Sequence, residues 1–214
     1  MKLLFISLGC DKNLVDSEVM LGMLTQKGYE ITDDEEQADA VVINTCCFIG
    51  DAKEESINTI LEMGKRRVSG QLKALIVTGC LAQRYHDEIQ KEIPEVDAIL
   101  GTTATEKIVE TLEKVLEGQP ENYLEDLDKK PVGGKKRVLT TGGYYDYLKI
   151  AEGCDKHCTY CIIPKVRGNY RSVPMEQLLA EARDLAEQGV RELILVAQET
   201  TLYGRDLYGE KSLP

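Results

Sequence analysis

The first 118 residues predict a doubly wound α/β domain, because short apolar runs alternate with stretches that carry helix-end signals. Runs that are apolar throughout are typical of parallel strands buried on both faces of a sheet. The expected strands cover residues 3–8, 29–31, 40–43, 74–77 and 96–100. Strands of this kind, separated by helices, favour a flavodoxin-like fold with a parallel five-stranded sheet.

The expected helices of this domain have recognisable ends. Asp16-Ser-Glu begins the first helix, which ends at Gly28. In the second helix the acidic residues come first and the basic residues last, as the helix dipole favours. The last helix is closed by a glycine, which readily takes the left-handed conformation that ends helices. The second, third and fourth helices are expected over residues 51–68, 82–93 and 104–117.

The remainder of the chain has a different pattern. Residues 119–146 are rich in turn-forming and charged residues, so they predict a linker with one short strand at 137–140. A second βα pattern follows over residues 147–214. Its expected elements are a strand, a helix and a strand over residues 147–151, 174–188 and 192–197. Two strands cannot close a barrel, so we expect the first βα units of a partial barrel in a truncated chain.

The composition excludes several classes of protein. A net charge of −11 disfavours a broad nucleic-acid-binding surface, although residues 165–171 form a local basic patch. No apolar stretch is long enough to cross a bilayer. The start of the chain superficially resembles a signal ending in a lipid-modified cysteine, but its apolar run is shorter than a secretory core. We therefore expect a cytoplasmic protein with no membrane partner and no direct nucleic-acid binding by this part.

The cysteines are the chemically informative residues. Their number is seven, which is odd and argues against a disulfide framework in a cytoplasmic protein. Three of them follow expected strands directly: Cys10, Cys46 and Cys80. Loops beyond the carboxyl ends of parallel strands meet at one edge of the sheet, so these thiols can converge. Gly9 and Gly79 permit the tight turns that aim two of the sulfurs inward.

The identity of this first site has alternatives. Cys47 is adjacent to Cys46 but falls outside the shared spacing, so we favour Cys46 as the ligand and treat Cys47 as a bystander. The thiols could instead be buried structural residues. Zinc is another alternative, but a structural zinc site usually takes four protein ligands. Three thiolates with one open position favour an iron–sulfur cluster with one labile iron.

A second group lies after the first strand of the second βα pattern. It comprises Cys154, Cys158 and Cys161, three thiols within eight residues. Three thiolates can hold three irons of a 4Fe–4S cube and leave the fourth iron free to bind S-adenosylmethionine. This CxxxCxxC spacing, with Tyr160 before the last cysteine, is the signature of radical S-adenosylmethionine enzymes. A zinc knuckle that uses His157 is the alternative. We interpret Tyr160 as an adenine contact rather than as a core residue.

With both groups identified, the whole chain resembles the methylthiotransferase family. The resemblance implies an auxiliary 4Fe–4S cluster on the first three cysteines, ahead of a radical S-adenosylmethionine barrel whose cluster is held by the second three. Segments 8–18 and 151–172 are similar to the branch that modifies ribosomal protein S-12. The tRNA-modifying branch typically has Gln-Met-Asn after its first cysteine. Two departures are Cys47, commonly glycine, and the absence of the remaining barrel and of the C-terminal TRAM domain.

The resemblance also implies an activity and its partners. The expected enzyme adds a methylthio group to the β-carbon of an aspartate of ribosomal protein S-12, alone or on the ribosome. Its cofactors are two 4Fe–4S clusters and S-adenosylmethionine: one cluster cleaves S-adenosylmethionine to a radical that removes hydrogen, and the other supplies sulfur. An electron donor such as flavodoxin or ferredoxin is implied.

Four further residues are candidates for cofactor binding. Gln198 and Glu199, at the end of the second barrel strand, are placed to bind the polar end of S-adenosylmethionine. Arg167 and Arg171 could hold its carboxylate or an acidic substrate, and the alternative is that they are solvated loop charges. Catalytic residues are not assigned.

Other functions stay open at this point. One is methylthio transfer to adenosine 37 of tRNA, which the acidity and the loop motifs disfavour. Another is a non-catalytic iron–sulfur carrier or electron-transfer module. We also expect the 214-residue chain by itself to be inactive, because most of the barrel is missing.

Overall fold

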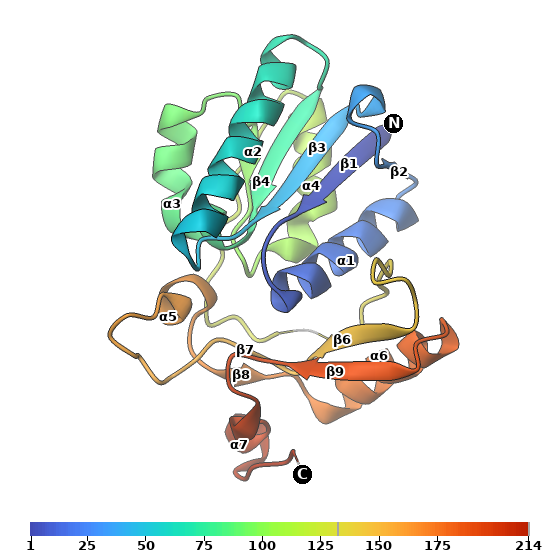
Figure 1. Cartoon of the computed structure of the whole chain (residues 1–214), viewed down its shortest axis with the longest axis vertical. Helices are drawn as coiled ribbons and strands as arrows, with labels where there is room; N and C mark the ends of the chain where they lie inside the picture. Colours follow the sequence, from blue (N-terminus) through green and yellow to red (C-terminus); the bar gives the residue numbers. More distant parts are fainter. Residues whose placement is uncertain (132, 214) are drawn as a thin grey trace. The chain divides into compact units, whose positions relative to one another are not determined.

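The structure is a computed structural model that describes residues 1–131 and 133–213 (Figure 1). The chain divides into two compact units, Met1–Glu125 and Asp126–Pro214. The division falls within the segment 119–146 that the sequence predicts as a linker. The first part of this segment belongs to the N-terminal unit, where Tyr123 forms a parallel bridge with Leu100.

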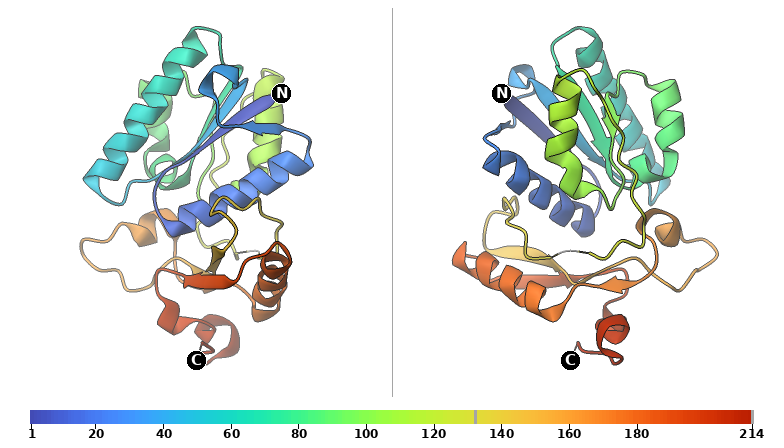
Figure 2. Two further views of the ribbon diagram at one scale, coloured as in Figure 1. Left: turned by 45° about the vertical axis from the view of Figure 1, so that its right-hand side comes forward. Right: turned by 180° about the vertical axis from the view of Figure 1, so that it is seen from behind.

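The N-terminal unit contains a parallel five-stranded sheet in the order β2-β1-β3-β4-β5. This is the strand order of flavodoxin-like doubly wound folds, so the expected fold class is confirmed. The apolar strand residues are buried because helices cover both faces of the sheet (Figures 1 and 2). The strands are β1 Lys2–Ser7, β2 Glu30–Thr32, β3 Ala40–Thr45, β4 Ala74–Thr78 and β5 Ala98–Ile99.

Helices α1 and α4 cover one face of this sheet, and α2 and α3 cover the other (Figure 2). The helices are α1 Asp11–Gln26, α2 Gly50–Val68, α3 Gly79–Glu92 and α4 Ile108–Leu116, with short 3-10 turns at η1 Glu35–Gln37 and η2 Thr105–Lys107. α3 bends at Tyr85, whose backbone leaves the helical region.

The starts of α1 and α3 differ from the sequence prediction. The expected cap of α1 near Asp16 is wrong, because the Ser17 hydroxyl donates to the carbonyl of Asn13, 2.9 Å away, and so lies inside the helix. α1 begins five residues earlier than Asp16, directly after Cys10. α3 begins at Gly79 instead of residue 82. Both helices therefore begin at the cysteine-bearing ends of strands.

The C-terminal unit contains the expected βα pattern. Strand β6 Tyr145–Lys149 pairs in parallel with β9 Glu192–Val196, and α6 Met175–Glu187 connects and covers them. Leu148, Ile150 and Leu185 are buried in its core. The structure adds elements that the sequence analysis did not predict: β7 Ala151–Glu152 with its antiparallel partner β8 Arg171–Ser172, and the short helices α5 Ile163–Arg167, η3 Thr200–Leu202 and α7 Arg205–Tyr208.

The strand expected at 137–140 is wrong, because the described backbone there forms no strand. The Arg137 guanidinium holds this segment instead. It lies 2.6 Å from a carboxylate oxygen of Asp146 and 2.9 Å from one of Glu181, and it donates to the carbonyl of Tyr147 at 2.7 Å. The bonds of this buried guanidinium, and not pairing with another strand, thus fix the segment in place.

None of the helices in the described part of the chain combines the length and apolar character needed to span a membrane.

Candidate metal centres

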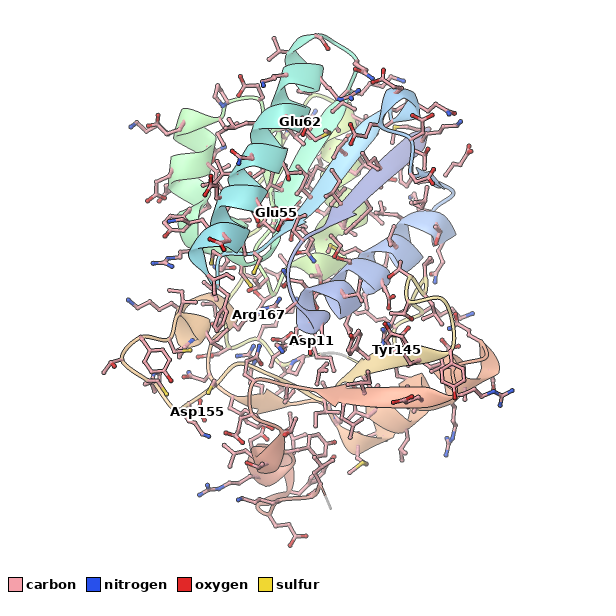
Figure 3. All side chains as sticks on the ribbon, viewed as in Figure 1. Asp11, Glu55, Glu62, Tyr145, Asp155 and Arg167 are labelled. Atoms are coloured by element: carbon pink, nitrogen blue, oxygen red, sulfur yellow. The ribbon has the colours of Figure 1, made fainter. Side chains whose placement is uncertain are left out.

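The three N-terminal cysteines lie at the carboxyl edge of the five-stranded sheet. Cys10 follows β1 and precedes α1, Cys46 follows β3, and Cys80 is the second residue of α3 after β4. β1 and β3 are neighbours at the point where the strand order reverses, which is where open α/β sheets bind ligands. Cys10 is exposed, whereas Cys46 and Cys80 are buried. Figure 3 labels Asp11, the first residue of α1.

Two glycines bring these loops into direct contact. Gly9 has a φ of +107°, and a Cβ added there would lie 2.8 Å from the Cβ of Cys46 and 3.1 Å from its Sγ. Gly79 has a φ of +92°, and a Cβ there would lie closer than 3.0 Å to Asn44 Oδ1 and to the backbone of Thr45. A side chain at either position would push the loops apart. The Cys10 and Cys80 loops therefore both pack against the Cys46 loop through glycine.

Asn13 joins all three loops, and the sequence analysis missed it. Its side chain is fully buried in the first turn of α1. Its Nδ2 donates to the carbonyl of Leu8 and to the carbonyl of Thr45, both at 3.0 Å. Its Oδ1 accepts from the Cys80 thiol at 3.8 Å. One signal in the sequence could have indicated Asn13. It is a polar residue about one helical turn after a cysteine, on a helix face that is expected to be buried.

The Cys47 thiol contacts the backbone of α3. Its Sγ donates to the carbonyl of Cys80 at 3.3 Å. Burial raises the pKa of the Cys47 thiol to about 11, with a further contribution from the neighbouring Cys80. Cys47 is therefore a neutral thiol that is bonded to the backbone of α3 at neutral pH. The preference for Cys46 over Cys47 as a ligand stays a prediction.

The three N-terminal cysteines offer thiolate donors, the ligand type that iron–sulfur clusters take. Among the residues that the structure describes, no three side chains of His, Cys, Asp or Glu converge on one metal-ion position. A single zinc ion needs such convergence, because all of its ligands surround one centre. In a 4Fe–4S cube each thiolate binds a different iron, so its ligands stay further apart. The three thiols lie on loops that pack against one another through Gly9 and Gly79, and a cluster held by them stays a prediction.

The second cysteine loop begins after β7 and is anchored at its start. Gly153 has a φ of +73°, and a Cβ there would lie 2.6 Å from the carbonyl carbon of Asn169. The backbone N–H of Cys154 donates to the carbonyl of Gly168 at 3.1 Å. Cys158 and Cys161 form a turn, in which the Cys161 N–H donates to the Cys158 carbonyl at 2.9 Å. Cys154 is thus fixed to the segment before β8, while Cys158 is exposed.

Glu199 lies beside this loop, as its sequence position predicts. Its carboxylate forms an ion pair with Lys156, a residue between the first two cysteines of the loop. The pair raises the pKa of Lys156, with contributions from Cys154 and Cys158, and lowers that of Glu199. Tyr160 is 90% exposed, so the alternative that it is a core residue is wrong. Its contact with adenine stays a prediction.

The two candidate arginines are buried, so the alternative that they are solvated loop charges is wrong. Arg167, labelled with Asp155 in Figure 3, lies 3.1 Å from a carboxylate oxygen of Glu152. Arg171 donates to the carbonyls of Arg167 at 3.0 Å and Asn169 at 2.7 Å. Burial lowers the pKa of Arg171. Both guanidinium groups are therefore built into the return path of the cysteine loop.

Glu152 is a second residue that the sequence analysis missed. Burial alone would raise the pKa of its carboxyl, but the cations of Lys149 and Arg167 outweigh that effect and lower the pKa to about 2. Glu152 Oε2, Arg171 Nε and Gln198 Oε1 are buried, and within the described part of the chain none of these atoms has a hydrogen-bond partner. Each such atom costs about 1–3 kcal/mol unless a water molecule or a polar ligand satisfies it. A polar ligand beside the cysteine loop would supply those bonds.

Two protein-family models match the chain and indicate its class. Residues 2–101 match the model of an uncharacterized protein family, UPF0004, and residues 148–211 match the radical SAM superfamily, named for S-adenosylmethionine. The first match covers the flavodoxin-like unit with Cys10, Cys46 and Cys80. The second covers the loop with the other three cysteines. The chain therefore combines a UPF0004 domain with the start of a radical SAM domain.

Individual proteins that are similar to the chain give more specific information than the family models do. The chain is 66% identical over its whole length to the ribosomal protein uS12 methylthiotransferase RimO of Lachnoclostridium phytofermentans, of which it covers 49%. It is 50% identical over 99% of its length to the protein of that name from Pelotomaculum thermopropionicum, of which it covers 48%. The chain thus spans about half the length of the curated relatives it matches. Over nearly its whole length, the chain is therefore similar to one half of proteins that are named as methylthiotransferases.

Proposed function

We propose that this chain is part of a radical SAM methylthiotransferase that adds a methylthio group to the β-carbon of an aspartate of ribosomal protein uS12. The supporting observation is that two separate trios of cysteines occupy the two units, one at the carboxyl edge of a parallel sheet and one in a CxxxCxxC loop. The similar proteins are named for uS12 as their substrate.

We propose two 4Fe–4S clusters and S-adenosylmethionine as cofactors. Cys10, Cys46 and Cys80 would hold the cluster that supplies sulfur. The ligands of the other cluster would be Cys154, Cys158 and Cys161. When bound, the second cluster and S-adenosylmethionine together supply the one-electron chemistry needed to remove hydrogen from an unactivated carbon, which acid–base side chains cannot do.

The protein's own residues would bind and orient the cofactor. Gln198 and Glu199 follow β9, which ends at Val196, and the unsatisfied Gln198 Oε1 is available to accept from the amino group of S-adenosylmethionine. The unsatisfied Nε of Arg171 is available to donate to its carboxylate. Arg167 would act mainly by holding Glu152 in place, and the exposed ring of Tyr160 would cover adenine.

The proposed setting is the cytoplasm, with uS12 as protein partner, alone or on the ribosome, and flavodoxin or ferredoxin as electron donor. Residues 1–118 would form the methylthiotransferase N-terminal domain. Residues 119–146 would connect this domain to residues 147–214, which would begin the barrel, with the first part of the connection, up to Glu125, packed on the N-terminal unit.

The test compares two substrates with the full-length protein from the same source, reconstituted anaerobically. Mass spectrometry should find a methylthio group on one aspartate of uS12, and S-adenosylmethionine should be cleaved under reduction. Modification of adenosine 37 in tRNA instead of uS12 would assign the protein to the other branch. If the clusters were stable but S-adenosylmethionine were not cleaved, the result would support the alternative that the protein is a non-catalytic iron–sulfur carrier.

A further inference from the structure

We propose that Asn13 is the positioning residue of the N-terminal site, holding the three cysteine loops in the arrangement that receives a cluster. This inference rests on the proposed cluster at Cys10, Cys46 and Cys80. Its basis is the set of bonds that one buried amide makes to all three loops: to the Leu8 and Thr45 carbonyls and to the Cys80 thiol.

The orientation of the Asn13 amide is fixed by its partners. Both carbonyls, of Leu8 and of Thr45, accept from Nδ2, which has two N–H groups to give. A flipped amide would set its oxygen against both carbonyl oxygens, which is repulsive. Oδ1 must therefore face the Sγ of Cys80, as observed at 3.8 Å.

Asn13 is itself held by a buried polar network. Its backbone carbonyl accepts from Asn44 Nδ2 and from the Ser17 hydroxyl, both at 2.9 Å. Asn44 Nδ2 also donates to the Ser17 hydroxyl at 2.9 Å, and that hydroxyl lies 2.7 Å from the hydroxyl of Ser7 in β1. Asn13 is thus attached through its backbone carbonyl to Asn44 of β3, and through Ser17 to β1, and not to the loops alone. Support of this kind keeps a site in one geometry before its ligand arrives.

Two substitutions separate the positioning role from simple space filling. Asn13→Asp keeps the size of the side chain; its carboxylate, when ionised, can donate to neither carbonyl and places a negative charge near the thiols. Asn13→Ser loses the same bonds without adding a charge, and it serves as the second variant if Asn13→Asp does not fold. Asn58→Asp on the exposed surface of α2 is the matched control.

The first readout needs no cluster. In iron-free full-length protein, the buried thiols Cys46 and Cys80 should be alkylated on the order of tenfold faster in both Asn13 variants, because two hydrogen bonds no longer close the loops. Mass spectrometry of the labelled peptides measures each rate. The Asn58→Asp protein should react at the unsubstituted rate. Unchanged alkylation of Cys46 and Cys80 in both variants would overturn the inference.

The second readout uses the cluster. In full-length protein whose Cys154, Cys158 and Cys161 are replaced by alanine, only the N-terminal site can hold iron, and reconstitution should give about four irons. Both Asn13 variants should hold fewer. Cluster retained by Asn13→Asp should have a lower reduction potential, which Asn13→Ser should not show, since added negative charge disfavours the reduced state. Full iron content with an unchanged potential in Asn13→Asp would also overturn the inference. If the protein with Asn13 intact binds no iron, the proposed function fails, and the alkylation rates still decide the role of Asn13.

Discussion

Replacement of Gly79 by alanine should destabilise the N-terminal unit more than any effect of backbone conformation can explain. Gly79 has a φ of +92°, which costs about 1–2 kcal/mol for a residue with a Cβ. The added methyl group would also lie 2.7 Å from the backbone nitrogen of Thr45 and closer still to its carbonyl oxygen. Forcing backbone apart in a packed interior costs about 1–3 kcal/mol more. The expected loss is therefore about 2–5 kcal/mol in the free energy of unfolding.

Gly70 provides the control for this prediction. Its φ is +80°, yet a Cβ added there would meet nothing within 4 Å. Gly70→Ala should therefore cost only about 1–2 kcal/mol, the contribution of the backbone conformation alone. Urea unfolding of the chain, followed by far-ultraviolet circular dichroism, measures both free energies. If Gly79→Ala were no more destabilising than Gly70→Ala, the close packing of the Cys80 loop on the Cys46 loop would be refuted.

Three further predictions concern the ionic groups and the ligand choice. Arg137→Met should destabilise the C-terminal unit by about 3–5 kcal/mol in urea unfolding, because it leaves two buried carboxylates without their cation; a loss under 1 kcal/mol would contradict the buried pairing. The pKa of Glu152 is about 2 in the folded protein, below the unfolded value of roughly 4.3, so its contribution to stability is complete above that value and is lost as the pH falls toward 2. Glu152→Gln should flatten this acid dependence, and an unchanged profile would count against the ion pairs. Cys46→Ala should abolish the N-terminal cluster whereas Cys47→Ala spares it, and iron analysis of both variants would expose the opposite assignment.

The fold was predictable because the central strands of its sheet contain continuous apolar runs. The runs at β3 and β4 are buried on both faces, and such runs can be recognised in a sequence without knowledge of their neighbours. The residues at which the helices begin were harder to predict from the sequence. Ser17 has the side chain of a helix cap, but here it bonds back into the helix, a choice that depends on the buried network around Asn13. The strand expected at 137–140 failed for a similar reason, since Arg137 bonds to Asp146 nearby and to Glu181, 44 residues away, a combination that only the folded chain brings together.

The cysteines of the candidate site were proposed from their spacing, and their role as ligands stays a prediction, whereas the residues that support them could not be predicted. Asn13 and Glu152 act through contacts with carbonyls and cations that only the folded chain brings together. Arg167 and Arg171 were expected near the cofactor, but their burial and their bonds within the cysteine loop were not visible in a charged segment. Periodicity reports which face of an element is buried, and it contains no information about the partner of a buried polar group.

Iron and sulfide analysis of the full-length protein after anaerobic reconstitution tests the central claim most directly. Two cubes predict about eight irons per chain, and replacement of Cys10, Cys46 and Cys80 by alanine should leave about four, with the spectrum of the radical SAM cluster unchanged. About four irons in the unsubstituted protein, or no loss of iron on replacement of these three cysteines, would contradict a second cluster at the edge of the N-terminal sheet.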